Sequence, residues 1–218
     1  MFEHVTGLNL PELKSETTQS GRMYVTPNGN KYPSVTTVLS HGTDQSWKEE
    51  WIKRVGAEEA ERVSRRATTR GTAVHELTEQ YLRNNPAYAK GHMPANVMSF
   101  NSIKPFLDKH IGRVAGLEIP LFSDTLRVAG RVDCIAEWDG VWSIVDFKTS
   151  RKEKKRDDIH SYFLQCSAYS MMMFERTGIA CKNAVIVMTV DEGNSLVFIE
   201  KNREWLPKFI EIREKVEL

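Results

Sequence analysis

The spacing of apolar residues makes the first half of the chain helical and the second half largely extended. Over residues 45–83, apolar side chains recur every three or four positions, the period of an amphipathic helix. Gly71-Thr72 is expected to break this segment into two helices, and a third helix is expected over 94–110. We interpret one apolar stripe in this region as core; it consists of Trp47, Trp51 and Val55, extended by Ile52 and Val63.

After Gly112 the apolar period changes to two, which is typical of strands. A helix is expected near 158–177, and Asn202 is expected to cap a last helix that runs to the C-terminus. The order of elements predicts a mixed α/β core that follows a helical N-terminal portion. The expected strands cover residues 117–122, 126–137, 141–148, 184–190 and 196–199.

The first forty residues contain weaker signals. Residues 1–20 are polar and without period, so we expect them to be flexible or loosely docked. The turn-forming run Pro27-Asn28-Gly29-Asn30 predicts a small hairpin over residues 22–32. Ser34 precedes an apolar run and is expected to be the N-cap of a short helix.

Composition adds few constraints. The 218 residues are 40% hydrophobic and 27% charged, and they contain no uninterrupted apolar run of about 18 residues. No basic segment followed by an apolar block occurs at the N-terminus, so we expect a cytoplasmic protein that is neither secreted nor bound to a membrane. The net charge of +1 means that any nucleic-acid binding must come from local patches.

Missing motifs exclude one kind of metal site and disfavour several familiar chemistries. The three cysteines, Cys134, Cys166 and Cys181, contain no CxxC pair, so this chain alone cannot supply a four-cysteine iron–sulfur cluster or zinc site. The phosphate-binding loop of kinases and ATPases, the dinucleotide-binding GxGxxG, HExxH and GxSxG are all absent from the sequence.

One hairpin brings charged residues together. Asp139-Gly140 favours a two-residue type I′ turn, which sets the register of the flanking strands. That register predicts that Asp133 lies opposite Asp146 and that Arg131 lies opposite Lys148. Two carboxylates in such a position repel by about 3 kcal/mol at an effective dielectric constant near 20, unless a divalent cation lies between them.

A structural alternative remains for this hairpin. Lys148 and Arg131 could neutralise both carboxylates on an ordinary surface hairpin. An exposed hairpin is disfavoured by the apolar opposite face, which must be core and consists of Val132, Cys134, Val145 and Phe147.

Motifs in this hairpin and on either side of it resemble a known family. Arg70-Gly71-Thr72-x-x-His75, Gly130-x-x-Asp133, Asp146-x-Lys148-Thr149 and Gln165-x-x-x-Tyr169 occur in this order and resemble the RecB-like branch of the PD-(D/E)XK nuclease superfamily. The run from Tyr32 to Leu39, followed by Trp51 and Gly56, is most similar to the mitochondrial genome maintenance exonucleases and their phage relatives.

The resemblance implies a restriction-endonuclease-like fold, a mixed sheet flanked by helices, in one nuclease domain over 1–218. A helical cap over about 45–111 would cover a catalytic core over about 112–218. The resemblance also implies one or two Mg²⁺ or Mn²⁺ ions, with Asp133 and Asp146 as ligands. His75, the Phe147 carbonyl and, less directly, Glu118 would complete the metal site.

The same resemblance assigns roles around the metal. Lys148 would assist the attacking water, and Gln165 and Tyr169 would line the site and contact the substrate. We expect the other substrate-binding residues to be Arg62, Arg66, Arg70, Thr72, Arg131 and Thr149. Each has an ordinary alternative: His75 can form an i,i+4 pair with Glu79, and the arginines can form a solvated helix face.

These expectations favour a DNA exonuclease that prefers single-stranded ends in replication, recombination or repair. The resemblance also implies a phage or organellar setting. Two alternatives remain open: a structure-selective endonuclease on the same fold, and a catalytically silent DNA-binding protein. The expected partner is DNA, and a replication or recombination protein that delivers it is not identifiable from the sequence.

Overall fold

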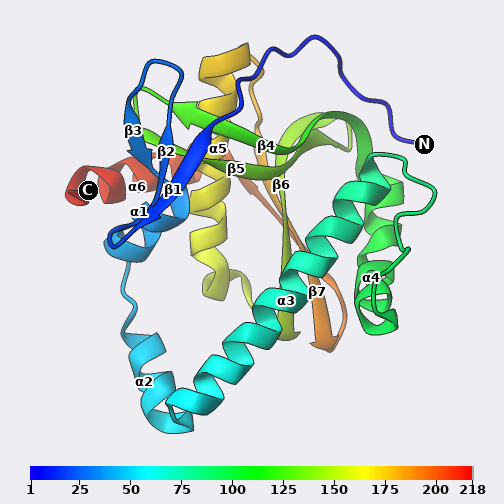
Figure 1. The fold of residues 1–218 in the computed structure, drawn as a ribbon. Coiled ribbons are helices and arrows are strands. Elements are labelled where there is room, and N and C mark those ends of the chain that lie inside the picture. Colours follow the sequence, from blue (N-terminus) through cyan, green and yellow to red (C-terminus); the bar gives the residue numbers. More distant parts are fainter. Residues whose placement is uncertain (218) are drawn as a thin grey trace.

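A five-stranded mixed sheet lies at the centre of the structure, a computed structural model in which residues 1–217 are described (Figure 1). β6 and β7 are parallel and all other neighbours are antiparallel. The parallel pair needs a crossover, which α5 (His160–Thr177) and the preceding turn η1 (Arg156–Ile159) provide. In sheet order, the strands are β4 (Ile111–Ser123), β5 (Val128–Trp138), β6 (Val141–Lys152), β7 (Asn183–Glu192) and β8 (Leu196–Lys201).

Helices cover both faces of this sheet. One core packs α1 (Val35–Gly42), α5 and α6 (Asn202–Lys215) against the sheet, around buried Phe163 and Phe209. A second core packs α4 (Pro94–His110) and the C-terminal half of α3 (Ala57–Leu82) through Leu77, Phe100 and Ile103. The predicted α/β fold and its order of elements are confirmed.

A small sheet precedes the main one and packs against its β4–β5 end. Its strands are β1 (Lys14–Thr18), β2 (Gly21–Val25) and β3 (Lys31–Pro33), and Tyr24 and Tyr32 lie in a third small core. The hairpin over 22–32 is confirmed, but the expectation that residues 1–20 are flexible or loosely docked did not foresee β1, which pairs with β2. Because every side chain of β1 is exposed, the strand has no apolar alternation and is held by backbone pairing with β2.

The structure tests three predictions about where helices begin or end, at Ser34, Gly71 and Asn202. The Ser34 hydroxyl accepts a hydrogen bond from the Thr37 amide at 3.0 Å, which confirms it as the N-cap of α1. The break at Gly71 is wrong, because α3 is continuous and the chain turns instead at Gly56, where φ is +88°. Asn202 is the first residue of α6 and makes no capping bond, so this prediction is also wrong.

α2 (Ser46–Val55) and residues 57–69 of α3 extend beyond the sheet and are here called the arm (Figure 1). No residue of α2 is buried, and residues 61–69 of α3 are all exposed. Assignment of the apolar stripe to the core is wrong at its ends, since Trp47 is 61% and Val63 40% exposed. Trp51, Ile52 and Val55 are half-buried near the junction with α3, so helical periodicity here marks a contact of α2 rather than a core.

Within residues 1–217, the helices are all too short or too polar to span a membrane.

Candidate active site

The sheet opens between β5 and β6 near Asp133 and Asp146. Pairing follows the predicted register from Trp138 opposite Val141 to Cys134 opposite Val145, and there it stops. Beyond this point, β5 continues along β4 while β6 continues along β7, with Asp146 opposite Ile186. The predicted pairs of Asp133 with Asp146 and of Arg131 with Lys148 are therefore wrong.

Asp133 explains how the two strands separate. Its Oδ2 accepts a hydrogen bond from the Phe147 amide at 2.9 Å, so a side chain takes the place of a backbone carbonyl in the ladder. A carboxylate with 13% exposure is thereby fixed at the mouth of the opening. The opening takes Asp133 and Asp146 out of the directly paired register, but the two carboxylates still interact, since the charge of Asp133 contributes to the raised pKa of Asp146.

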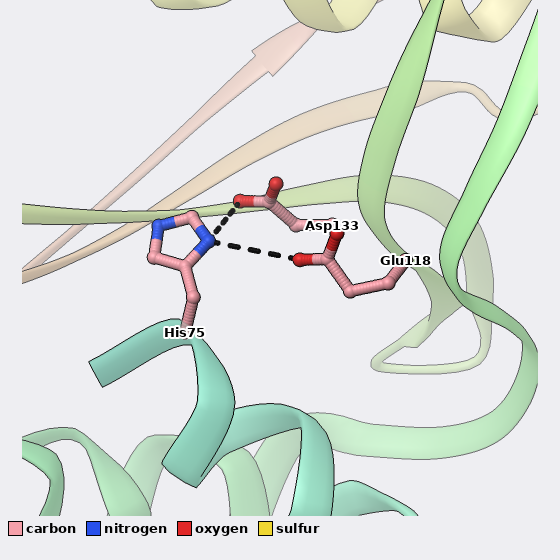
Figure 2. Close-up of side chains that lie close together, drawn as sticks. All are labelled: His75, Glu118 and Asp133. Atoms are coloured by element: carbon pink, nitrogen blue, oxygen red, sulfur yellow. Dashed lines mark ion pairs between the residues drawn. The ribbon is translucent and has the colours of Figure 1, made fainter. Parts of the chain in front are cut away.

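His75, Glu118 and Asp133 form a group that can hold a metal ion (Figure 2). His75 Nδ1 lies 3.5 Å from Asp133 Oδ2 and 3.8 Å from Glu118 Oε1, and one ligand atom of each residue lies within 4.8 Å of the others. The three come from α3, β4 and β5. Glu118 adopts φ +51° in β4, a backbone conformation that costs an ordinary residue free energy.

The donor set suits a divalent cation of intermediate hardness. Carboxylate oxygens favour Mg²⁺ and Mn²⁺, whereas an imidazole nitrogen favours transition metals, so Mn²⁺ matches the mixed set best. The geometry also shows why the two carboxylates of this group need a positive charge beside them. Two carboxylates converge on one imidazole, and a cation between the three groups would replace the proton that now holds them together.

Burial opposes protonation of His75, but its ion pairing with Glu118 and the charge of Asp133 outweigh it and raise the pKa of His75 to about 9. At neutral pH the metal-free site therefore contains an imidazolium between two carboxylates. A metal ion and this proton compete for the same nitrogen.

We expect this ion pairing to stabilise the metal-free protein within a defined pH window. The pKa of His75 is raised in the folded state, so its contribution is complete below about pH 6.5 and is lost as the pH rises through 9. Unfolding by urea in EDTA should show a free energy that falls by up to about 3 kcal/mol across this window. A His75→Gln variant should lose that slope; an unchanged slope would contradict the pairing.

Asp146 and Lys148 form a second, more deeply buried pair beside this group. Lys148 Nζ lies 2.6 Å from Asp146 Oδ2, and the two side chains are 20% and 4% exposed. Burial raises the pKa of Asp146 to about 6 in spite of Lys148, and the neighbouring carboxylates raise the pKa of Lys148 against its own burial. Asp146 Oδ2 is buried and makes no aligned hydrogen bond, which leaves a lone pair free for a cation.

One face of α5 lies near the buried pair of Asp146 and Lys148. Tyr169 is buried, and burial raises the pKa of its phenol well above the usual range against an opposing hydrogen bond with Gln165. Gly130 makes room for this ring, because a Cβ there would lie 2.6 Å from the Tyr169 hydroxyl. Sequence reasoning missed Tyr162, whose ring centre lies 4.9 Å from Lys148 Nζ. Its position three residues before Gln165, which puts both on the same helix face, was the signal that could have identified it.

The predicted substrate-binding arginines have different surroundings. Arg70 donates to Asp191 at 2.6 Å and to Thr189 at 2.9 Å, so it joins α3 to the end of β7. Arg62 pairs with Glu59 on the exposed arm, and Arg66 has no ion pair among residues 1–217.

Arg131 makes its contacts with β4 and the N-terminal segment rather than with Lys148. It donates to the Glu118 carbonyl oxygen and lies 3.5 Å from the Glu12 carboxylate, so it supports the strand that carries Glu118.

A cavity of about 520 Å³ opens beside the His75 group. Thr72 and Arg131 line it, as do Glu76 and Glu79, two acidic residues that sequence reasoning did not assign to the site. They lie one and four positions after His75 on α3, a spacing that keeps Glu79 on the same helix face. Thr149 lies on β6 where α3 crosses it, since a Cβ at Gly71 would be 3.8 Å from its hydroxyl.

The fold and these acidic groups define a class of protein, and a comparison with known families agrees. Residues 47–188, more than half of the chain, match the model of the PD-(D/E)XK nuclease superfamily. The chain belongs to this superfamily, whose members typically use divalent metals.

Two named relatives are similar to this chain. It is 28% identical over 180 residues to the human protein Mitochondrial genome maintenance exonuclease 1, covering 76% of this chain and 51% of the relative. The mouse protein of that name is 28% identical over 132 residues, covering 57% and 39%. The chain thus spans about half the length of the human relative. A crystal structure of a candidate exonuclease from Eubacterium rectale aligns with a TM-score of 0.42 and 16% identity over 68% of this chain and 69% of that one.

Proposed function

We propose that this protein is a metal-dependent DNA exonuclease that acts on single-stranded ends. The observation that carries the proposal is the group of His75, Glu118 and Asp133 beside the buried pair of Asp146 and Lys148. This arrangement places metal-ligating oxygens and a cationic amine at one opening in the sheet. Membership of a nuclease superfamily, with relatives named as exonucleases, supports the same reaction.

Each residue has a role that follows from its surroundings. His75, Glu118 and Asp133 would hold a Mn²⁺ or Mg²⁺ ion, with Asp146 as a further ligand through Oδ2, the oxygen that also pairs with Lys148. The bound ion would lower the pKa of a water and stabilise charge on the phosphate. Phe147 fixes Asp133 through its amide, and we propose that its carbonyl faces the ion.

Lys148 is the residue suited to assist the attacking water or to neutralise a phosphate oxygen. It remains protonated at neutral pH because Asp146 and Asp133 oppose its burial. Tyr162 lies beside its ammonium and restricts where the side chain can move. Gln165 and Tyr169 offer neutral hydrogen bonds to the substrate from α5, and Thr72 and Thr149 can do the same from α3 and β6.

The arm suits a single strand better than a duplex. Residues 62–70 contain four arginines, and no acidic residue occurs between Glu61 and Glu76. This basic stretch leads directly along α3 to His75, whereas the exposed Trp47 lies on α2. Unstacked bases can stack on an indole while arginines follow the phosphates, and single strands are bound through this combination.

Substitution of Trp47 by alanine should therefore weaken the binding of long single strands about 5- to 150-fold, the loss of one base-stacking contact. Trp47→Phe should retain most of the affinity. α3 spans about 27 Å from its start to His75, so a trinucleotide bound at the site is too short to reach Trp47. The cleavage of trinucleotides should therefore be unaffected by Trp47→Ala. Fluorescence anisotropy with oligothymidylate in EDTA measures the affinity, and Phe174→Ala, which removes another exposed aromatic residue, is the control. Equal losses in the two variants would contradict a specific role of Trp47.

The activity itself is tested with linear single strands, circular single strands and linear duplex, each in Mg²⁺, Mn²⁺ or EDTA. We expect degradation of linear single strands, faster in Mn²⁺, and none in EDTA. Cleavage of circles would show an endonuclease instead. Binding without hydrolysis in either metal would show a catalytically silent protein and overturn the proposal.

A further inference from the structure

A second cavity, of about 550 Å³, lies where α5 ends and α6 begins. It shares no lining residue with the cavity beside His75. On α5, the residues that line it, such as Met171 and Phe174, lie roughly opposite Tyr169, whose hydroxyl lies against Gly130 of β5. The nuclease chemistry therefore does not account for this cavity.

The surface of the cavity is mostly apolar. Met171 and Leu206 are half-buried within it, and Phe174 is 53% exposed at its edge. An aromatic side chain left in water beside a preformed apolar cavity is typical of a site that is covered by a ligand.

The charge around the cavity has one sign. Lys182, Lys201 and Arg203 line it, and no acidic residue does. Lys201 Nζ donates a hydrogen bond to Asn183 Oδ1 at 2.9 Å. In the described part of the chain, the side chains of Lys182 and Arg203 make no hydrogen bond or ion pair, so both are available to an anion.

The start of α6 adds to this positive charge. This 14-residue helix has no side-chain cap, so the first turn offers amide groups and the positive end of the helix dipole. Asn202, which lines the cavity and is 3% exposed, donates to the Cys181 carbonyl at 3.0 Å. Its Oδ1 is buried without a partner, an unsatisfied acceptor at the cavity wall.

We propose that this cavity binds the carboxyl-terminal end of a partner polypeptide whose last side chain is large and apolar. The apolar side chain would cover Phe174, Met171 and Leu206. The terminal carboxylate would lie between Lys182 and Arg203 at the start of α6. A lipid acid also joins an apolar group to a carboxylate, but the last residue of a polypeptide adds a backbone N–H that can donate to the unpartnered Asn202 Oδ1. The cavity is open on one side, which lets the rest of the polypeptide leave.

The test uses a fluorescein-labelled pentapeptide that ends in Leu-Phe with a free carboxylate, and the same peptide amidated. By fluorescence anisotropy, the free acid should bind at least about tenfold more tightly, because a charge-assisted hydrogen bond is lost on amidation. Arg203→Glu should lower the affinity by a similar factor and Arg203→Lys by less. Lys215→Glu, the same charge change on an exposed residue of α6 outside the cavity, should have little effect.

Melting temperature and DNA hydrolysis should be unchanged in Arg203→Glu, which shows that the variant is folded. Equal binding of acid and amide, equal effects of the two charge reversals, or no binding at millimolar peptide would overturn the proposal. Displacement by octanoate or oligothymidylate at lower concentrations than by unlabelled peptide would assign the cavity to a lipid acid or to nucleic acid, and would also overturn it.

Discussion

Replacement of Asp146 by asparagine should lower the rate of DNA hydrolysis by at least about 10³-fold. Asp146 Oδ2 is a buried oxygen beside the proposed metal site, and a lost metal interaction of several kcal/mol corresponds to this factor. Initial rates on end-labelled single strands in saturating Mn²⁺ measure the effect. Asp108→Asn, which removes a carboxylate from an exposed pair on α4, is the matched control and should retain activity.

The same substitution separates the catalytic from the structural role of Asp146. A neutral amide at this position would leave the Lys148 ammonium without its charged partner, so the free energy of unfolding in EDTA should fall. Adding Lys148→Met should recover part of this loss while activity stays absent, with a coupling of about 1–3 kcal/mol between the two sites. Additive effects on unfolding would show that the pair does not interact as the geometry indicates. Activity in Asp146→Asn close to that of the unmodified protein would overturn the metal-ligand role.

Binding of Mn²⁺ should release about one proton per ion at pH 7.5. The pKa of His75 is about 9 in the metal-free protein, so its imidazole is mostly protonated at this pH and must lose the proton before Nδ1 can bind a metal. The apparent affinity should accordingly rise about tenfold per pH unit between pH 7 and 9 and then level off. Isothermal titration calorimetry in buffers of different ionisation enthalpy measures the released proton.

His75→Asn is the informative variant for this experiment. It should bind Mn²⁺ with lower affinity, with no proton release and with little pH dependence above pH 7, where Asp146 is already mostly ionised. If the unmodified protein releases no proton and His75→Asn binds equally well, then His75 pairs only with Glu118 and Asp133 and does not ligate the metal. That outcome would leave the carboxylates as the metal site.

Local patterns predicted most of the secondary structure for identifiable reasons. The Asp139-Gly140 turn determined the β5–β6 register as far as Cys134 and Val145, because a two-residue loop leaves one way to pair the strands. The helix at 94–110 and the Ser34 cap also follow from neighbouring residues. The errors fall where a local signal had two possible readings: Gly71 was taken for a break although Gly56 makes it, and Trp47 for core although it lies on the arm.

The sequence alone determined the candidates for the site, since Asp133, Asp146, Lys148 and His75 stand in motifs that can be identified without coordinates. Their spatial grouping depended on the tertiary structure. The side chain of Asp133 takes the Phe147 amide, which opens the sheet and places Asp133 with His75 and Glu118, while Asp146 pairs with Lys148. Such an opening depends on which neighbour each strand pairs with beyond the hairpin, and long-range packing, not local spacing, decides that choice.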